Sequence, residues 1–104
     1  MMYTQTTQEL LELDRIDNSL KHKLKRIQKQ EQFKYANFHR FDALTKREKE
    51  IVVLLANDFN NPQIAEMLFI SRFTVEQHRK NINRKLGINS YLQLYQFALA
   101  FNLV

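Results

Sequence analysis

Polar and cationic side chains recur at helical spacing along residues 71–86 of this sequence. On a helical wheel they share one side of the segment with one aromatic ring. The set comprises Phe73, Thr74, Gln77, Lys80, Asn81 and Arg84. Amide, ammonium and guanidinium groups can pair with base edges or with phosphate oxygens. The pattern therefore predicts a helix that presents a recognition face to double-stranded DNA.

The same segment carries the signals of a helix with one buried side. Val75, Ile82 and Leu86 fall opposite the polar face, so we expect them in a hydrophobic core. Ser71 is a favourable N-cap, and Gly87, the only glycine of the chain, suits a left-handed C-cap. The helix should begin at Ser71 and stop at Gly87.

Two more helices are predicted upstream of this segment. Thr45 and Glu48 match a capping box, in which each side chain bonds the other residue's backbone N–H, so a helix should begin at Thr45. The next helix has Asn61 as its expected N-cap and Pro62 at its first position, and it ends near Leu68. Three residues then lead into the recognition segment, which is the spacing of a helix-turn-helix.

A final helix is predicted from a second capping box, formed by Ser90 and Gln93. Apolar residues cover much of its circumference. They are Tyr91, Leu92, Leu94, Tyr95, Phe97, Ala98 and Phe101. One small core cannot use all of them, so the excess either packs on the N-terminal part of the chain or forms a dimer seam. Both interpretations stay open at the level of sequence.

The N-terminal part predicts one amphipathic helix of about 20 to 25 residues, because its apolar residues recur at steps of three and four. They are Leu10, Leu13, Ile16, Leu20, Leu24 and Ile27. Its basic run comprises Lys21, Lys23, Lys25, Arg26 and Lys29. That run could touch phosphates, but a solvated helix face is the favoured interpretation. An aromatic connector of Phe33, Tyr35, Phe38 and Phe41 follows. We expect this connector to dock on the core.

Composition sets the outer bounds. A chain of 104 residues with one proline fits one small helical domain plus an extension, and so small a core favours a partner subunit. The formal charge of +5 favours a polyanionic partner. Cysteine is absent, and neither a signal pattern nor a membrane-spanning run is found, so we expect a cytoplasmic protein without membrane contact.

Catalytic and metal sites are not predicted. His22, His39 and His78 lack metal-ligand spacing, and no cysteine, carboxylate pair or glycine-rich phosphate loop accompanies them. We therefore expect no enzyme activity, no metal, no cofactor and no small-molecule ligand.

The spacings resemble a known DNA-binding family. The matching residues are Leu44, Thr45, Arg47, Glu48, Glu50, Ile64, Ala65, Leu68, Ile70, Ser71, Thr74, Val75, His78, Asn81, Ile82, Lys85, Leu86 and Gly87. Together they resemble the LuxR/GerE-type helix-turn-helix of bacterial transcription regulators. The resemblance implies an all-α four-helix DNA-binding domain over residues 42–104. The long amphipathic helix and the aromatic connector, predicted above from spacing, precede it in residues 1–41. It also implies that the third helix of the domain enters the major groove and that the fourth mediates homodimerisation.

Position by position, the resemblance and the wheel assign roles to residues of this chain. Base contacts are expected from Glu76, Gln77 and Lys80. Phosphate contacts are expected from Arg72, Thr74, Asn81, Arg84 and Lys85. The dimer interface is expected to include Tyr91, Leu94, Tyr95 and Ala98. Gln77 could bond adenine through two hydrogen bonds, Lys80 could donate to guanine, and Glu76 could accept from cytosine.

A competing hypothesis rests on departures from the family pattern. Glu76 places an acid where a basic residue is common, and Pro62 removes a backbone donor. The alternative is a protein-binding module of the same fold that sequesters another regulator or contacts RNA polymerase. A region similar to a sigma factor ranks third. The sequence does not identify the DNA site, the regulating signal, or whether a longer product carries this segment.

Overall fold

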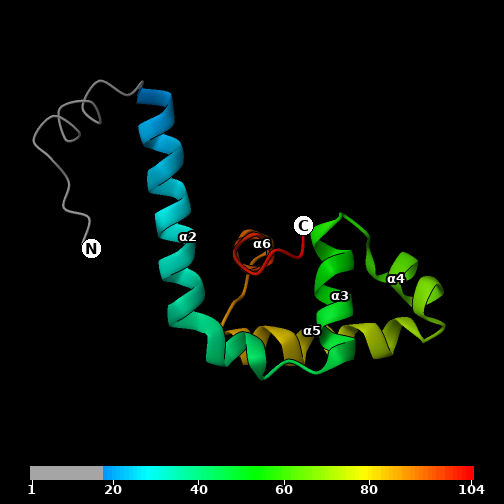
Figure 1. The fold of residues 1–104 in the computed structure, drawn as a ribbon. Helices are drawn as coiled ribbons and strands as arrows, with labels where there is room; N and C mark the ends of the chain where they lie inside the picture. The colour runs from blue at the N-terminus through cyan, green and yellow to red at the C-terminus, as the bar shows by residue number, and fades with distance from the viewer. Residues whose placement is uncertain (1–17) are drawn as a thin grey trace, which may run out of the picture.

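A computed structural model describes residues 18–104, in which short turns and loops connect five helices. The helices are α2 (Asn18–Asp42), α3 (Lys46–Ala56), α4 (Asn61–Leu68), α5 (Arg72–Leu86) and α6 (Tyr91–Ala100). Helix α2 stands at one end, α4 at the other, and α3 and α6 lie between them above α5 (Figure 1). The all-α architecture predicted from the sequence is confirmed. None of the helices in residues 18–104 is long and apolar enough to cross a membrane.

The core lies where α3, α4, α5 and α6 meet. Its largest fully buried side chains are Ile51, Val52, Ile64, Val75, Ile82 and Leu86. The prediction that Val75, Ile82 and Leu86 form the inner side of the recognition segment is confirmed, since all three are 0% exposed. Burial of this stripe fixes the rotation of α5 about its own axis, so the opposite stripe must face outward.

Helix α3 begins as predicted. The Thr45 N–H donates to Glu48 Oε1 at 2.7 Å, and the Glu48 N–H donates to Thr45 Oγ1 at 3.1 Å. Helix α4 corrects the expected cap, because Asn60 rather than Asn61 precedes it. The reason is local: Gln63 lies three residues after Asn60, so the two side chains satisfy each other's backbone N–H at 3.0 and 2.9 Å. If Asn61 were the N-cap, the residue three positions later would be Ile64, whose side chain has no polar group to accept from the Asn61 N–H.

The ends of α5 also agree with the sequence. Ser71 Oγ accepts from the Thr74 N–H at 3.0 Å, and Gly87 adopts φ 68° as the left-handed C-cap. In α6, Ser90 caps the helix, but the expected box is only half formed. Gln93 Oε1 accepts from the Asn89 N–H at 2.8 Å instead of from Ser90, so the second bond satisfies a donor one residue further back.

Helix α2 differs most from the expectation. The predicted aromatic connector is its C-terminal half, because the helix runs without a break to Asp42. Phe33 packs edge-on against Phe97, with ring centroids 4.9 Å apart, and Phe41 stacks on Phe101 at 4.1 Å. The other two aromatic residues do not dock, since Tyr35 is 90% exposed and Phe38 is 56% exposed. Leu10, Leu13 and Ile16, which we assigned to the same amphipathic helix, lie outside the described residues.

Candidate nucleic-acid interface

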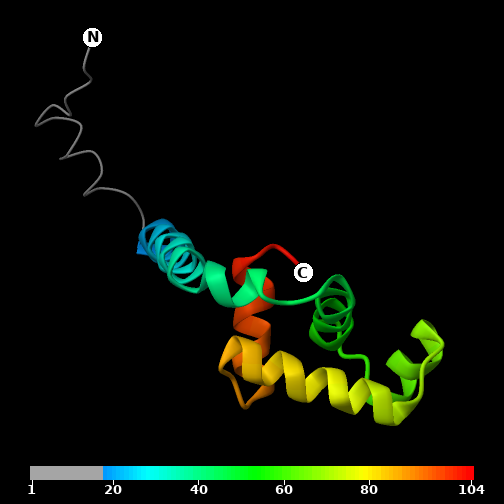
Figure 2. The same cartoon turned by 90° about the horizontal axis from the view of Figure 1, so that it is seen from below.

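Helices α4 and α5 form the predicted helix-turn-helix. Residues 69–71 join them, and Phe69 takes the left-handed conformation with φ 55° that ends α4. The Ile70 N–H then donates to Ala65 O at 3.0 Å, which holds the turn against α4. Helix α5 lies along one edge of the molecule, and the view from below shows it uncovered along its length (Figures 1 and 2).

A side-chain hydrogen bond links α4 to α5. Arg79 is partly buried, and its Nη1 donates to Asn61 Oδ1 at 2.9 Å. The sequence placed Arg79 near the core side of α5 as an extended side chain, which agrees with this position. Asn61, expected as a cap, instead serves as the acceptor that ties α4 to α5. This pairing could not be predicted from local spacing, because eighteen residues separate the partners.

The three expected base-contacting residues share the outer face of α5. Glu76, Gln77 and Lys80 are all exposed, and they occupy adjacent turns of the same helix. Phe73, one turn earlier on this face, is 68% exposed. Its ring adds an apolar surface of the kind that can contact a thymine methyl group. The face thus offers an amide, a cation, an acid and an aromatic ring within about two turns.

Four of the five expected phosphate contacts border the same face. Arg72, Asn81 and Arg84 are exposed, and Arg84 Nη2 donates to Asn81 Oδ1 at 3.4 Å. Thr74 is half-buried, with its hydroxyl 2.8 Å from that of Ser71. Both hydroxyls lie in the first turn of α5, where free backbone N–H groups and the helix dipole favour an anion.

Lys85, the fifth expected phosphate contact, has another partner. Its Nζ donates to Glu48 Oε1 at 2.6 Å, and the side chains of Lys85 and Glu48 are 23% and 3% exposed. The pair joins α5 to the cap of α3. Since the ammonium is directed at a buried carboxylate, we remove Lys85 from the phosphate set and assign it to holding α5 in place.

The Glu48 carboxylate is held in its ionised form. Burial alone would raise its pKa, but the hydrogen bonds from Lys85 and from the Thr45 backbone and hydroxyl outweigh that effect and lower the pKa below the ordinary value. A buried carboxylate of this kind needs all of its donors, because an unpaired charge in the interior is costly. The recognition helix is therefore positioned by one charge-assisted contact as well as by apolar packing.

The expected dimer residues divide into two groups. Leu94 and Ala98 are 4% and 0% exposed and belong to the core of this chain, so a partner cannot contact them while α6 is packed. Tyr91 is 49% exposed and stacks near Tyr95 with centroids 6.1 Å apart. Leu92, which the expected set omitted, is 77% exposed. The exposed apolar surface of α6 therefore lies at the start of the helix.

Tyr91 also links α6 to the turn that follows α3. Its hydroxyl donates to Asp58 Oδ1 at 3.0 Å, and Asp58 has the left-handed φ of 68°. Partial burial together with the neighbouring Asp58 carboxylate raises the pKa of Tyr91, so the phenol stays a neutral donor. The Tyr91 side chain nevertheless remains 49% exposed.

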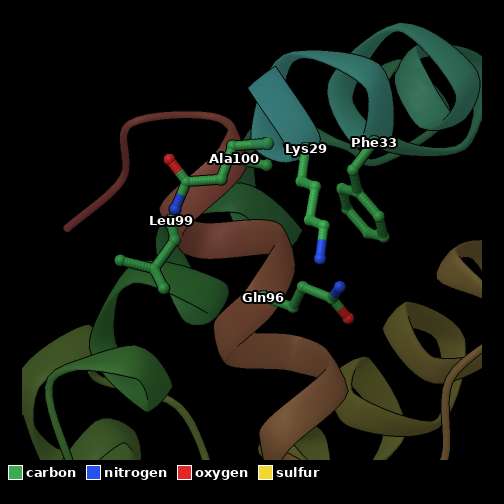
Figure 3. Close-up of a pocket in the computed structure, with 6 residues that line it drawn as sticks. Lys29, Phe33, Gln96, Leu99 and Ala100 are labelled. Carbon is green, nitrogen blue, oxygen red and sulfur yellow. The ribbon is translucent and has the colours of Figure 1, made fainter. Parts of the chain in front are cut away.

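A small pocket lies between α2 and α6, with a volume near 90 Å³. Its lining comprises Lys29, Gln30, Phe33, Gln96, Leu99 and Ala100. The Lys29 ammonium and the Gln96 amide point toward one another beside the Phe33 ring (Figure 3). Ligand sites usually enclose about 300 Å³ or more. We therefore interpret this pocket as incomplete packing between the two helices.

Residues 42–98 match the family model described as bacterial regulatory proteins, luxR family. The chain is also similar to the oxygen regulatory protein NreC of Staphylococcus aureus strain JH9, with 48% identity over 59 residues, and the same values hold for strain NCTC 8325 / PS 47. The match covers 57% of this chain but only 27% of either relative. The shared segment contains α3, α4 and α5 and most of α6.

Proposed function

Because this chain belongs to the luxR family of bacterial regulatory proteins, whose common segment is a DNA-binding domain, we propose that it binds double-stranded DNA sequence-specifically and regulates transcription. In this proposal α5 enters the major groove and α4 crosses the phosphate backbone beside it. The protein would act in the cytoplasm, where the bacterial chromosome lies. The oxygen response in the relatives' name is not carried over, since most of their length has no counterpart here.

One observation carries the proposal: the burial of Val75, Ile82 and Leu86 turns Gln77 and Lys80 outward on an uncovered helix. An α-helix fits the major groove, where each base pair presents a distinct pattern of donors and acceptors. We assign Gln77 to adenine, Lys80 to guanine and Glu76 to the amino group of cytosine. Arg72, Thr74, Asn81 and Arg84, which border these three residues, would bind phosphates and set the register.

We further propose that DNA is bound by a homodimer through the start of α6. Tyr91 and Leu92 are exposed there, Tyr95 is partly buried beside Tyr91, and a twofold axis would place the same patch on both subunits. Each subunit would then contribute one α5 to a half-site. Contact with RNA polymerase, if it occurs, would use surfaces that the bound duplex leaves free.

The direct test selects bound duplexes from a random pool with the full chain and then titrates salt against the best sequence. We expect one enriched motif whose affinity falls steeply with salt, since cations on the protein displace counterions from the duplex. A pool without enrichment, or binding that does not change with salt, would refute the proposal. That result would favour the alternative in which the fold binds a protein.

A further inference from the structure

One aromatic ring stands among the polar residues on the outer face of α5. Phe73 is 68% exposed, and it belongs neither to the core nor to the partly buried residues packed against the core. None of the aromatic or cation–π contacts within residues 18–104 involves it. A ring exposed to this degree gains little from burial in the folded chain, so stability does not account for its position.

Helical geometry directs this ring away from the core. Phe73 precedes Gln77 by four residues and Lys80 by seven, which places all three at similar angles around an α-helix. Val75 lies on the opposite side of α5 and is 0% exposed. Phe73, Gln77 and Lys80 therefore form one row along the side of α5 that the other helices leave uncovered (Figure 2).

The backbone that carries Phe73 is held in place by the residues on either side of it. Ser71 Oγ accepts from the Thr74 N–H at 3.0 Å, and the hydroxyls of Ser71 and Thr74 are 2.8 Å apart. Phe73 thus belongs to a capped first turn. In helix-turn-helix proteins, the N-terminal residues of the recognition helix are the ones that contact base edges.

The proposed hydrogen-bonding contacts leave thymine unread. Gln77, Lys80 and Glu76 are assigned to adenine, guanine and cytosine, whereas thymine is marked in the major groove by its C5 methyl group. An apolar side chain is the group that recognises this methyl. Resting on the proposed function, we propose that Phe73 packs on a thymine methyl group and selects a T·A pair at that position of the DNA site. The contact removes the exposed ring and the methyl group from water together.

The order of residues along α5 predicts where this thymine lies. Four residues of helix rise about 6 Å, which is roughly two base-pair steps of duplex DNA. Gln77 lies between Phe73 and Lys80 in the row. The thymine should therefore lie about two base pairs from the pair that Gln77 contacts, on the side away from the pair that Lys80 contacts.

The test removes the methyl group alone. In the duplex selected from the random pool, deoxyuridine replaces each thymine in turn, which leaves the hydrogen-bonding groups of the base unchanged. We expect the wild-type chain to lose affinity about fourfold at that one position, since this is the effect of burying one methyl group. Phe73→Ala should bind the thymine and deoxyuridine duplexes equally. Phe73→Leu, which keeps an apolar side chain, should retain at least about a twofold preference.

Phe38→Ala is the matched control. Phe38 is also an exposed phenylalanine, at 56%, but it lies on α2, so its removal should leave the full preference for thymine. Circular dichroism of Phe73→Ala should match that of the wild-type chain, because the ring is exposed. A lost preference then reflects a lost contact and not an unfolded domain.

A gain of affinity provides the second measurement. Replacing the selected T·A pair by C·G removes the methyl group and also changes the hydrogen-bonding groups. Placing 5-methylcytosine at that cytosine should restore about fourfold in affinity to the wild-type chain and nothing to Phe73→Ala. Equal restoration in both chains would show that another group reads the methyl.

The results separate this inference from the proposed function. A bound duplex whose thymines can all be replaced without effect overturns the inference alone. The same holds for a methyl preference that survives Phe73→Ala, or for a selected motif without a T·A pair at the expected position. If no duplex is bound, the proposed function fails and the thymine contact is refuted with it.

Discussion

At the scale of single residues, the two cations Lys80 and Lys85 show how position on one helix decides a role. Lys80 is exposed on the outer face of α5, whereas Lys85 is held by Glu48 on the side toward α3. Both residues are lysines of the same basic helix, so residue type alone does not distinguish their roles. The difference comes from the buried carboxylate, which removes one of the two ammonium groups from the surface that DNA could reach.

We predict that Lys85→Ala lowers the free energy of unfolding by about 3 kcal/mol, which is the low end for a broken buried ion pair because Lys85 remains 23% exposed. The cost arises because Glu48 keeps its burial and loses its charge partner. Urea titration at neutral pH measures the change. Arg47→Ala is the matched control: it breaks the exposed Arg47–Glu50 pair and should cost less than about 1 kcal/mol. Equal losses in the two variants would contradict the assigned role.

The same carboxylate predicts a pH dependence. The folded state lowers the pKa of Glu48, so its contribution to stability is present above the unfolded pKa and is lost as the pH falls through the folded value. The stability of the wild-type chain should therefore decline more steeply below about pH 4.3 than that of Glu48→Gln. Urea midpoints measured at neutral pH and at several acidic values compare the slopes. Parallel slopes would show that Glu48 does not contribute.

On the outer face of α5, we predict that removing a base contact and removing a phosphate contact weaken DNA binding in different ways. Lys80→Ala should relax the preference at one base pair, at a cost of about 1–3 kcal/mol for the preferred site. Arg84→Ala should weaken all duplexes alike and reduce the salt slope by about one. Competition binding with single-base variants of the selected site distinguishes the patterns. Lys25→Ala, which removes a cation on the N-terminal half of α2, serves as the control and should change neither quantity.

At the scale of elements, the two halves of α2 differ in their surroundings. Its C-terminal half packs on α6 through Phe33 and Phe41, and Arg40 Nη1 lies 3.5 Å from Leu86 O at the end of α5. The recognition helix is thereby in contact with the N-terminal part of the chain. The domain boundary expected after residue 41 falls at the end of α2. Helix α2 nevertheless packs against the helices that follow this boundary.

We predict that Phe33→Ala lowers the free energy of unfolding of the whole chain by about 2 kcal/mol, less than for a fully buried phenylalanine because Phe33 is only half-buried. Phe38→Ala, five residues further along the same helix, is the control because Phe38 is 56% exposed and should change stability by less than about 0.5 kcal/mol. Thermal or urea unfolding monitored by circular dichroism reports both. A stable Phe33→Ala chain would mean that α2 does not belong to the folded unit.

These elements also show what sequence can predict. Helix starts at Thr45 and Ser71 and the stop at Gly87 depend on residues within one turn, so local spacing found them. The aromatic segment of α2 could not be assigned in the same way, because the partners of Phe33 and Phe41 lie about sixty residues away on α6. The Glu48–Lys85 pair escaped prediction for the same reason. The outer face of α5 could be predicted from the sequence, because it lies opposite the apolar stripe that is buried in the core.

At the scale of the whole molecule, exposed apolar side chains lie on different helices within residues 18–104. The start of α6 exposes Leu92 beside Tyr91, and the N-terminal half of α2 exposes Leu20, Leu24 and Ile27. The proposed α6 seam would place two recognition helices on one duplex.

The α6 surface can be tested by a charge placed on α6 alone. Leu92→Asp should leave the fold intact, since Leu92 is 77% exposed, but it should weaken binding to a duplex with two half-sites at least about tenfold, because bringing the α6 seam together would bury the new carboxylate. Binding to an isolated half-site should not change. Phe38→Asp places the same charge at an exposed apolar residue outside the seam and should bind both duplexes like the wild-type chain.

A footprint of the bound protein on DNA tests the spacing of the half-sites. Two α5 helices related by a twofold axis should protect half-sites whose centres are about 10 base pairs apart, or a multiple of that, on one face of the duplex. In the Leu92→Asp chain, protection of the two halves should become independent, with the weaker half filling only at higher protein concentration. If Leu92→Asp still fills both halves together, the α6 seam is not what couples them, and the coupling would have to come from another surface of the chain.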